Sequence, residues 1–347
     1  MHTLIESDSG DFDRYWTRLI TCEPVKNPLY AQPQLSASWS CRNFENHSFV
    51  VVSDDEAVIG CGLTLNVDEL GRRCLGYFGM EASSLINPQS LSRSGGHIDA
   101  EAVSLFQSHF RQLLEVLCPD KLEFFDPVAC GLMSPLTHIL IEHGGVPKVY
   151  MSQCIELAYH ETQLWQSLSR SCREWIEQGQ GRLQFEFISG RDLDEQPVQT
   201  PALQSMQERR RQGALSELSQ AQWQTGRSLV RSGNGFLVQA HEPGQQTLSA
   251  LFVHYGNSCH YVIDDSVLVP GRESQLASMI WQAMLRSRQL GCSDFELDGR
   301  LTYCAAQNRD QDCTGFRPEE FGGRAQTRMH VSVEQKLDSR AYPREVA

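Results

Sequence analysis

The most informative pattern of hydrophobic positions lies between residues 247 and 264. Two runs rich in Val, Ile, Phe and Tyr, at 249–255 and 259–264, are separated by Gly256, Asn257 and Ser258. Branched and aromatic side chains on both sides of a short turn are typical of a β-hairpin. The pattern therefore predicts two antiparallel strands.

The hydrophobic period changes after this hairpin. From residue 272 to residue 290 apolar side chains recur every three or four positions, and Gly291 follows them. This spacing predicts an amphipathic helix that ends at the glycine. The next apolar run, Phe295 to Leu297, predicts a buried strand, so the segment has the order strand, helix, strand.

The rest of the chain repeats this order. In the first half the patterns predict helices at 11–22, 99–117 (capped by Asp99) and 135–143, strands at 48–53, 57–65, 73–79, 122–125 and 148–158, and a loop at 84–99. In the second half they predict further strands at 182–189, 235–241, 294–298 and 326–333 and a short helix about Tyr303. Corresponding elements are offset by roughly 170 to 190 residues, which indicates an internal duplication.

The duplication divides the chain into similar parts. At 347 residues the chain is long enough for two domains of about 150 residues each. We expect a first domain at 1–160, a connecting helix at 161–181, a second domain at 182–335 and a polar tail at 336–347. The expected fold class of each domain is α/β, with a mixed sheet packed against helices.

Composition narrows the possible partners and the location. The formal net charge of −13 disfavours general affinity for nucleic acid or anionic membranes. No apolar run approaches the about 18 residues of a membrane helix, and the acidic start MHTLIESDSGDFD lacks the apolar core of a signal peptide. We therefore expect a cytoplasmic protein.

The twelve cysteines predict neither a disulfide framework nor a metal site. They include no C-x-x-C pair, and most of them, such as Cys61, Cys154 and Cys292, lie within apolar patterns. A free cysteine in such a pattern behaves as a small hydrophobic residue. No metal is expected in the chemistry.

The start of the helix at 272–290 predicts a site for an anionic group. Pro270 and Gly271 break the chain before the helix, so free backbone N–H groups and the helix dipole converge there. An ordinary amphipathic helix packed on a sheet is the alternative.

Three segments resemble the Fem-type acyltransferases of the GNAT superfamily, relatives of the peptidoglycan bridge-forming aminoacyltransferases. They are LSRSCREWI between the halves, FELDG at the end of a strand, and GFRPEEFGG near the end of the chain. The GNAT donor loop reads Gln or Arg, two residues, Gly, one residue, then Gly or Ala. Arg272 and Ala277 match its ends, and Gln275 replaces the middle Gly. Where the Fem family carries Phe-Lys, this chain has Phe316 and Arg317.

The resemblance covers about residues 10 to 333 and implies two tandem GNAT-like domains joined by a helix. It implies acyl-CoA as the donor, a reaction centre in the second domain, and an acceptor in the groove between the domains. The residues expected at the donor are Arg272, Ser274, Gln275, Ala277 and Arg317. The first domain, which has no donor loop in residues 80–99, is expected to be a scaffold.

Two carboxylates are candidates for the catalytic base. Acyl transfer to an amine needs a base for the amine and an acid for the leaving group. These groups should lie at the C-terminal ends of adjacent strands, where an open sheet exposes its crevice. Asp298 meets this condition and is the first candidate, and Glu296 shares its face by strand alternation. A turn or a helix cap is the alternative role for Asp298.

Two tyrosines are candidates for the acid. Tyr303 follows the Asp-Gly turn, where many GNAT-like enzymes place a tyrosine that protonates the leaving thiolate, and Tyr255 ends a predicted strand. Amphipathic packing is the alternative for both tyrosines. His254 and His260 are expected to be structural.

Two groups of arginines predict anionic partners. Arg170 and Arg173 would bind the acceptor, such as a nucleotide-linked amino sugar, because guanidinium groups bind diphosphates in bidentate geometry. Ion pairs with Glu174 and Glu177 are the alternative. Residues 204–232 carry five arginines against two acidic residues, which suits either tRNA or a solvated helix face.

The expected function is transfer of an acetyl or longer acyl group from acyl-CoA to the amine of a small or envelope-related acceptor. An aminoacyl-tRNA-dependent transferase is one alternative, which the acidic balance of the chain disfavours. A non-catalytic GNAT-like scaffold is the other. The replaced loop glycine favours the scaffold, whereas Asp298 and Tyr303 favour an enzyme.

Overall fold

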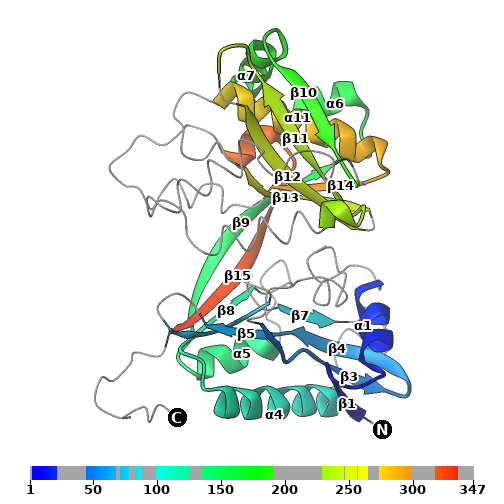
Figure 1. Cartoon of the computed structure of the whole chain (residues 1–347), viewed down its shortest axis with the longest axis vertical. Helices are drawn as coiled ribbons and strands as arrows, with labels where there is room; N and C mark the ends of the chain where they lie inside the picture. The colour runs from blue at the N-terminus through cyan, green and yellow to red at the C-terminus, as the bar shows by residue number, and fades with distance from the viewer. Residues whose placement is uncertain are drawn as a thin grey trace.

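The computed structural model of the chain describes residues 2–21, 44–67, 71–77, 83–86, 99–125, 135–190, 192, 229–245, 247–255, 257–264, 273–297 and 317–334. These residues form an N-terminal and a C-terminal lobe, each a sheet with helices against it, and two long strands connect them (Figure 1). The mixed α/β class agrees with the sequence prediction.

The N-terminal lobe contains a four-stranded antiparallel sheet in the order β1-β3-β4-β7 and part of a longer sheet. Its strands are β1 (His2–Glu6), β2 (Glu45–Asn46), β3 (Phe49–Ser53), β4 (Glu56–Gly62), β5 (Thr64–Val67), β6 (Arg73–Gly76), β7 (Ser83–Ile86) and β8 (Lys121–Phe125). Phe49 and Val51 of β3 face a core with α4 (Ala100–Leu117) and α5 (Pro135–Glu142). Val50 and Val52 face α1 (Phe12–Thr21). Because both faces of β3 are covered, its sequence is apolar without alternation.

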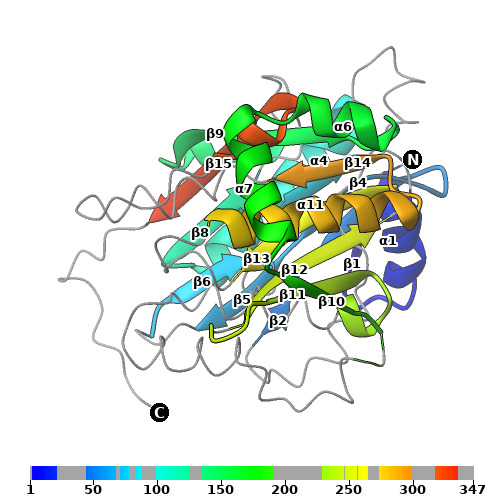
Figure 2. The same cartoon turned by 90° about the horizontal axis from the view of Figure 1, so that it is seen from above.

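The C-terminal lobe is built on consecutive strands of the longer sheet. They are β10 (Gln184–Ile188), β11 (Gly235–His241), β12 (Leu248–Tyr255), β13 (Ser258–Asp264) and β14 (Asp294–Leu297). The helices α6 (Glu161–Ser167), α7 (Arg170–Gln180) and α11 (Glu273–Gln289) lie together over this sheet (Figure 2). Leu164, Ile176 and Ile280 of these helices share one core with Phe252 and Phe295 of the strands.

The last strand of each half completes the sheet of the other lobe. β9 (Val146–Glu156) follows α5, yet its residues 153–156 pair with β14. β15 (Arg324–Glu334) ends the described chain, yet its residues 330–334 pair with β8 of the N-terminal lobe. Between these ends β9 and β15 pair with each other. One sheet of eleven strands therefore runs through both lobes in the order β10-β11-β12-β13-β14-β9-β15-β8-β6-β5-β2.

The two halves repeat the same elements. The helices α4 and α11 begin at positions 100 and 273, the strands β8 and β14 at 121 and 294, and the strands β9 and β15 at 146 and 324, so the offset is nearly constant. In each half a helix lies in the chain between two strands that pair in parallel, α4 between β6 and β8 and α11 between β13 and β14. This repetition agrees with the duplication expected from the sequence.

Local details differ from the prediction at several places. The strand expected at 57–65 is two strands, β4 and β5, which belong to different sheets. The single helix expected at 161–181 is two helices, because Leu168 is extended and Ser169 begins α7 by accepting a hydrogen bond from the Cys172 N–H at 3.0 Å. The loop expected at 84–99 begins as strand β7, which pairs with β4 although its sequence is half serine. Strand β1 was not expected. The short helix about Tyr303 and the tail at 336–347 lie outside the described residues.

Gly179 lets α7 approach α11 closely. A Cβ atom at Gly179 would lie 2.0 Å from Ser278 Oγ and 2.9 Å from the Ser274 carbonyl oxygen. We expect Gly179→Ala to lower the free energy of unfolding by about 1–3 kcal/mol, because the added methyl group forces the helices apart. Denaturant unfolding measures the change. Gly181→Ala is the matched control, since a Cβ atom there meets open space, and equal stability of both variants would contradict the close contact.

Candidate functional site

A parallel pair of strands joined by a helix forms the centre of the C-terminal lobe. α11 lies between β13 and β14 in the chain, and the two strands run parallel. The register joins Ser258 with Asp294, Cys259 with Phe295 and His260 with Glu296. Among the described residues this last pair ends the ladder, although β13 continues to Asp264. Ligands of open α/β sheets bind at the carboxyl ends of such strands. We call this end of the β13–β14 pair, where His260 and Glu296 lie, its mouth.

The two faces of this pair have different surroundings. Phe295 and Leu297 of β14, like Cys259 and Tyr261 of β13, are buried in the core beneath α7 and α11. Glu296 and His260 alternate with them and point to the opposite face. Glu296 Oε2 lies 3.5 Å from His260 Nδ1, and their side chains are only 11% and 16% exposed. A nearly buried carboxylate and an imidazole therefore lie together at the mouth.

The neighbours of this pair are thiol and apolar groups as well as a second acid. Cys154 of β9 lies opposite Glu296, and the buried Val253 of β12 lies opposite His260. Asp294, on the same face, accepts hydrogen bonds from Ser293 Oγ at 2.8 Å and from Cys154 Sγ at 3.9 Å. Low local polarity strengthens the electrostatic interaction between the imidazole and the Glu296 carboxylate.

The N-terminus of α11 is the second part of the site, because α11 follows the C-terminal end of β13. Ser274 is half-buried, whereas Gln275 is 3% exposed and Ala277 is fully buried. Gln275 Nε2 donates a hydrogen bond to Glu242 Oε2 at 2.9 Å. The side chains of Gln275 and Ala277 thus hold the helix start against the protein. At Gln275 the backbone N–H group lies in the first turn and remains a contact for an anionic group, whereas Ala277 lies beyond the turn whose N–H groups are free.

Several predicted site residues lie outside the described residues. They are Asp298, Tyr303 and Arg272. Tyr255 ends β12 opposite Ser258, but its side chain lies outside the described part of the chain. The structure therefore gives no position for these side chains, and the roles of all the site candidates, Glu296 included, remain predictions.

The structure does not bring Arg170 and Arg173 beside Glu296. Both belong to α7, which covers the opposite face of the sheet. The Arg170 side chain is 87% exposed, and its Nε donates to Glu174 Oε1 at 2.8 Å, the ion pair that the sequence offered as the alternative. Arg317 is exposed before η2 (Pro318–Phe321). Glu320 of η2 accepts a hydrogen bond from Ser171 Oγ, and its burial raises the pKa of its carboxyl group.

His260 lies beside Glu296, a contact that the sequence analysis did not predict. It was expected to be structural, as was His254. His254 points to the helix-covered face, where its ring lies 6.5 Å from the ring of Phe236. Burial lowers the pKa of His254, which favours the neutral imidazole. Only the parallel register of β13 and β14 distinguishes His260, and that register joins residues from two strands with a whole helix between them in the chain.

The N-terminal lobe carries a different arrangement at the corresponding strands. β8 has Glu123 where β14 has Glu296, since both residues are the third of their strands. Glu123 pairs with Lys121 of its own strand at 2.8 Å. By register the counterpart of His260 is Gly76, the next residue of β6 after the Leu75–Leu122 pair. The first half therefore keeps the carboxylate without a neighbouring imidazole at this register.

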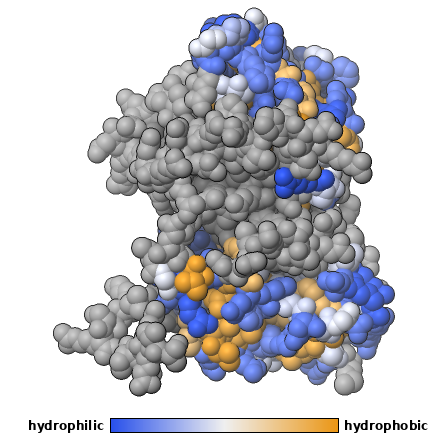
Figure 3. Space-filling model, in the orientation of Figure 1, coloured by the Kyte–Doolittle hydropathy of each residue, from blue (hydrophilic) through white to orange (hydrophobic). Residues whose placement is uncertain are grey.

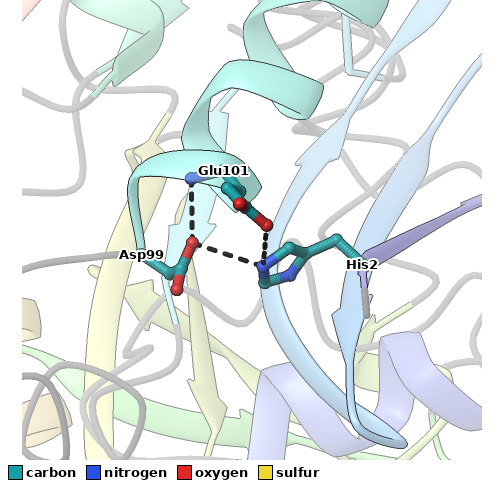
Figure 4. Close-up of side chains that lie close together, drawn as sticks. All are labelled: His2, Asp99 and Glu101. Atoms are coloured by element: carbon teal, nitrogen blue, oxygen red, sulfur yellow. Dashed lines mark hydrogen bonds and ion pairs between the residues drawn. The ribbon is translucent and has the colours of Figure 1, made fainter.

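A cluster of one histidine and two carboxylates joins β1 to the start of α4. His2 Nε2 lies 3.3 Å from Asp99 Oδ1 and 3.6 Å from Glu101 Oε2 (Figure 4). Asp99 Oδ1 also accepts hydrogen bonds from the Glu101 and Ala102 N–H groups at the helix start. His2 Nδ1 is buried without a hydrogen-bond partner among the described residues, whereas a metal-bound histidine usually donates its other N–H to a partner. These contacts favour a helix cap with an ion pair.

Exposed apolar residues lie on the N-terminal lobe. Figure 3 shows hydrophobic residues among hydrophilic ones on the described surface of that lobe. Val116 of α4 and Ile141 of α5 are 70% and 38% exposed. Single exposed apolar residues are common on soluble proteins and need no partner.

Within the described residues, no helix has both the length and the apolar character needed to cross a membrane.

Known structures share the overall fold of this chain. No protein-family model and no curated sequence matches the chain. The crystal structure of FemX matches with a TM-score of 0.58 at 11% identity, over 95% of this chain and 96% of FemX. A tandem GNAT protein from the clavulanic acid biosynthesis pathway matches with a TM-score of 0.52 at 11% identity, over 96% of this chain and 98% of that protein. This chain therefore has the tandem GNAT fold that is found in FemX.

Proposed function

We propose that the chain is an N-acyltransferase that moves an acyl group from acyl-CoA to the amine of a small acceptor. The observation that carries the proposal is the mouth of the β13–β14 pair. It combines the last rung of a parallel ladder, the nearly buried Glu296 and the start of the connecting helix α11. A thioester bound at this mouth would have a base beside its carbonyl group and helix N–H groups near its phosphates.

Glu296 acts as the base in this proposal. Its carboxylate takes up the proton that the acceptor amine loses as the amine nitrogen attacks the thioester carbonyl carbon. A carbon–nitrogen bond forms, the carbon–sulfur bond breaks, and the coenzyme A thiolate leaves with the bonding electrons and takes up a proton. Asp298 follows β14 and provides a second carboxylate, and Tyr303 is the proposed proton donor to the thiolate, with Tyr255 as the second candidate.

The donor phosphates are proposed to bind at the first turn of α11. The backbone N–H groups of this turn would contact the phosphates together with the Arg272 guanidinium group and the Ser274 hydroxyl group. Cations and free N–H groups both favour phosphate. Arg317 is a further cation for the donor. Acyl-CoA is a cytoplasmic metabolite, so the proposal places the protein in the cytoplasm.

The acceptor is proposed to be an amine that also carries an anionic group, such as a nucleotide-linked amino sugar or another cell-envelope precursor. Arg170 and Arg173 are the cations proposed for it from the sequence. In the structure α7 covers the face opposite Glu296 and Arg170 pairs with Glu174, so the geometry of the described residues does not support this contact for a small acceptor.

An aminoacyl-tRNA donor is the alternative that the FemX fold favours. A non-catalytic binding protein is the second alternative, which the replacement of the loop glycine by Gln275 favours. The proposed function and its alternatives predict different ligands, so measuring whether acyl-CoA or tRNA binds the protein helps to distinguish them.

Thermal unfolding with candidate donors tests the proposal. We expect acetyl-CoA or a longer acyl-CoA to stabilise the protein by about 2.7 kcal/mol at 100 times its Kd, because a ligand that binds only the folded state stabilises it by mass action. Free pantetheine, which lacks the nucleotide phosphates, is the matched control and should give a smaller shift. Stabilisation by tRNA alone would favour the first alternative. No response to any acyl-CoA would remove the proposed function.

A further inference from the structure

We propose that His260 is a positioning residue for Glu296, holding its carboxylate in the orientation that accepts the amine proton. The inference deepens the proposed function and rests on it. In the resting state the neutral imidazole donates its Nδ1 proton toward Glu296 Oε2. This leaves Oε1 as the basic oxygen that faces the acceptor.

The contact itself carries the inference. His260 Nδ1 and Glu296 Oε2 are 3.5 Å apart, and both side chains are nearly buried. A buried carboxylate is costly unless a donor or a cation accompanies it. The nitrogen nearest to the carboxylate is Nδ1, so the geometry selects the tautomer with its proton on Nδ1.

The strand register places His260 next to Glu296. His260 and Glu296 are opposite residues on adjacent parallel strands, and strands in a sheet lie about 4.8 Å apart. Val253 and Cys154 occupy the positions on either side of the pair, on β12 and β9. The strands on both sides fix where the two backbones lie, and the imidazole contact is what the sheet adds to orient the carboxylate.

One proton moves during bond formation in this step, and the imidazole does not take part in its transfer. The amine proton moves to Glu296 Oε1 as the carbon–nitrogen bond forms, and His260 keeps its own proton on Nδ1. The imidazole changes neither its charge nor its oxidation state. Its contribution is orientation, and a misplacement of about 1 Å in a reacting group costs about 10²-fold in rate.

The N-terminal lobe supplies an internal comparison. Its corresponding carboxylate, Glu123, has Lys121 as its ionic partner and Gly76 at the position of His260. The partner of the first carboxylate is an ammonium group of its own strand, whereas the partner of the second is an imidazole of the neighbouring strand. The two halves share a fold, and the pairing of imidazole with carboxylate distinguishes the half proposed to be catalytic.

Two substitutions of His260 separate orientation from packing. The amide nitrogen of asparagine can occupy the place of Nδ1, and that of glutamine the place of Nε2. We therefore expect His260→Gln to lower kcat by about 10²-fold with unchanged KM for acyl-CoA, and His260→Asn to recover most of that loss. Thermal unfolding shows whether each variant folds. A purely structural role predicts equal losses in both folded variants, and that result would overturn the proposal.

A spectroscopic measurement keeps this test separate from the test of the proposed function. In protein labelled with ¹⁵N-histidine, the ring nitrogen signals report the tautomer of His260. We expect the Nδ1–H form in the unaltered chain and a changed signal in Glu296→Gln, while Asp294→Asn leaves it unchanged. A His260 signal that does not respond to Glu296→Gln would refute the pairing, whether or not acyl transfer is found. If the pairing is found and no acyl-CoA binds, the proposed function fails instead.

Discussion

Replacing Glu296 with glutamine should lower kcat for acyl transfer by about 10²- to 10⁴-fold, the contribution of one general base. Glutamine has nearly the same shape as glutamate, but its amide cannot accept the amine proton. Glu296 is only 9% exposed and lies at the last rung of the parallel ladder, so the substitution removes the base while leaving the mouth of the sheet filled. Steady-state kinetics with saturating acyl-CoA measure the loss, and KM for the donor should stay within a small factor.

Two matched variants locate the effect. Glu123→Gln makes the same chemical change in the N-terminal lobe, where the carboxylate pairs with Lys121, and turnover should not change. Asp298→Asn tests the other candidate base, which follows β14 in the chain. A folded Glu296→Gln variant with full turnover would contradict the assignment of Glu296, and a large loss in Asp298→Asn alone would move the base to that residue.

A chain that ends at Gly323 should fail to fold, although it keeps every helix that the structure describes. β15 lies between β9 and β8 in the middle of the long sheet, so its removal exposes a strand edge on both sides. It also removes Val331 from the N-terminal core, where it is fully buried, together with the packing of Met329 and Val333. The lost pairing and burial should exceed the about 5–15 kcal/mol by which folded domains are stable.

Soluble yield, circular dichroism and thermal unfolding check this expectation. The matched control is a chain that ends at Glu334, which keeps all of β15 and lacks only the polar tail expected from the sequence. It should unfold at the same temperature as the full chain. Val331→Asp is a milder test, because it buries a charge at one point of the same strand and should destabilise the N-terminal lobe. If the chain that ends at Gly323 unfolded like the full chain, the strand exchange would be refuted.

The sequence by itself determined most of the elements and their order. Its hydrophobic periods located α4 with its Asp99 cap, the β12–β13 hairpin, α11 and β14 to within a few residues. These features depend on side chains close together in the chain, and a period of two or of three to four residues records which face is buried. The duplication also followed, because it is an order of such elements. Glu296 was predicted to face the site because strand alternation is local as well.

The tertiary structure alone decided which distant segments meet. Strand exchange through β9 and β15, the position of α7 on the face opposite Glu296, and the pairing of His260 with Glu296 depend on registers between segments far apart in sequence. A one-residue shift of register would turn His260 to the other face without any change in its local pattern. Gln275 illustrates the same limit, since its place in the donor-loop pattern implied a ligand contact, whereas in the structure its side-chain amide donates to Glu242. Periodicity specifies the buried face of each element, and only the packed sheet specifies which neighbour covers it.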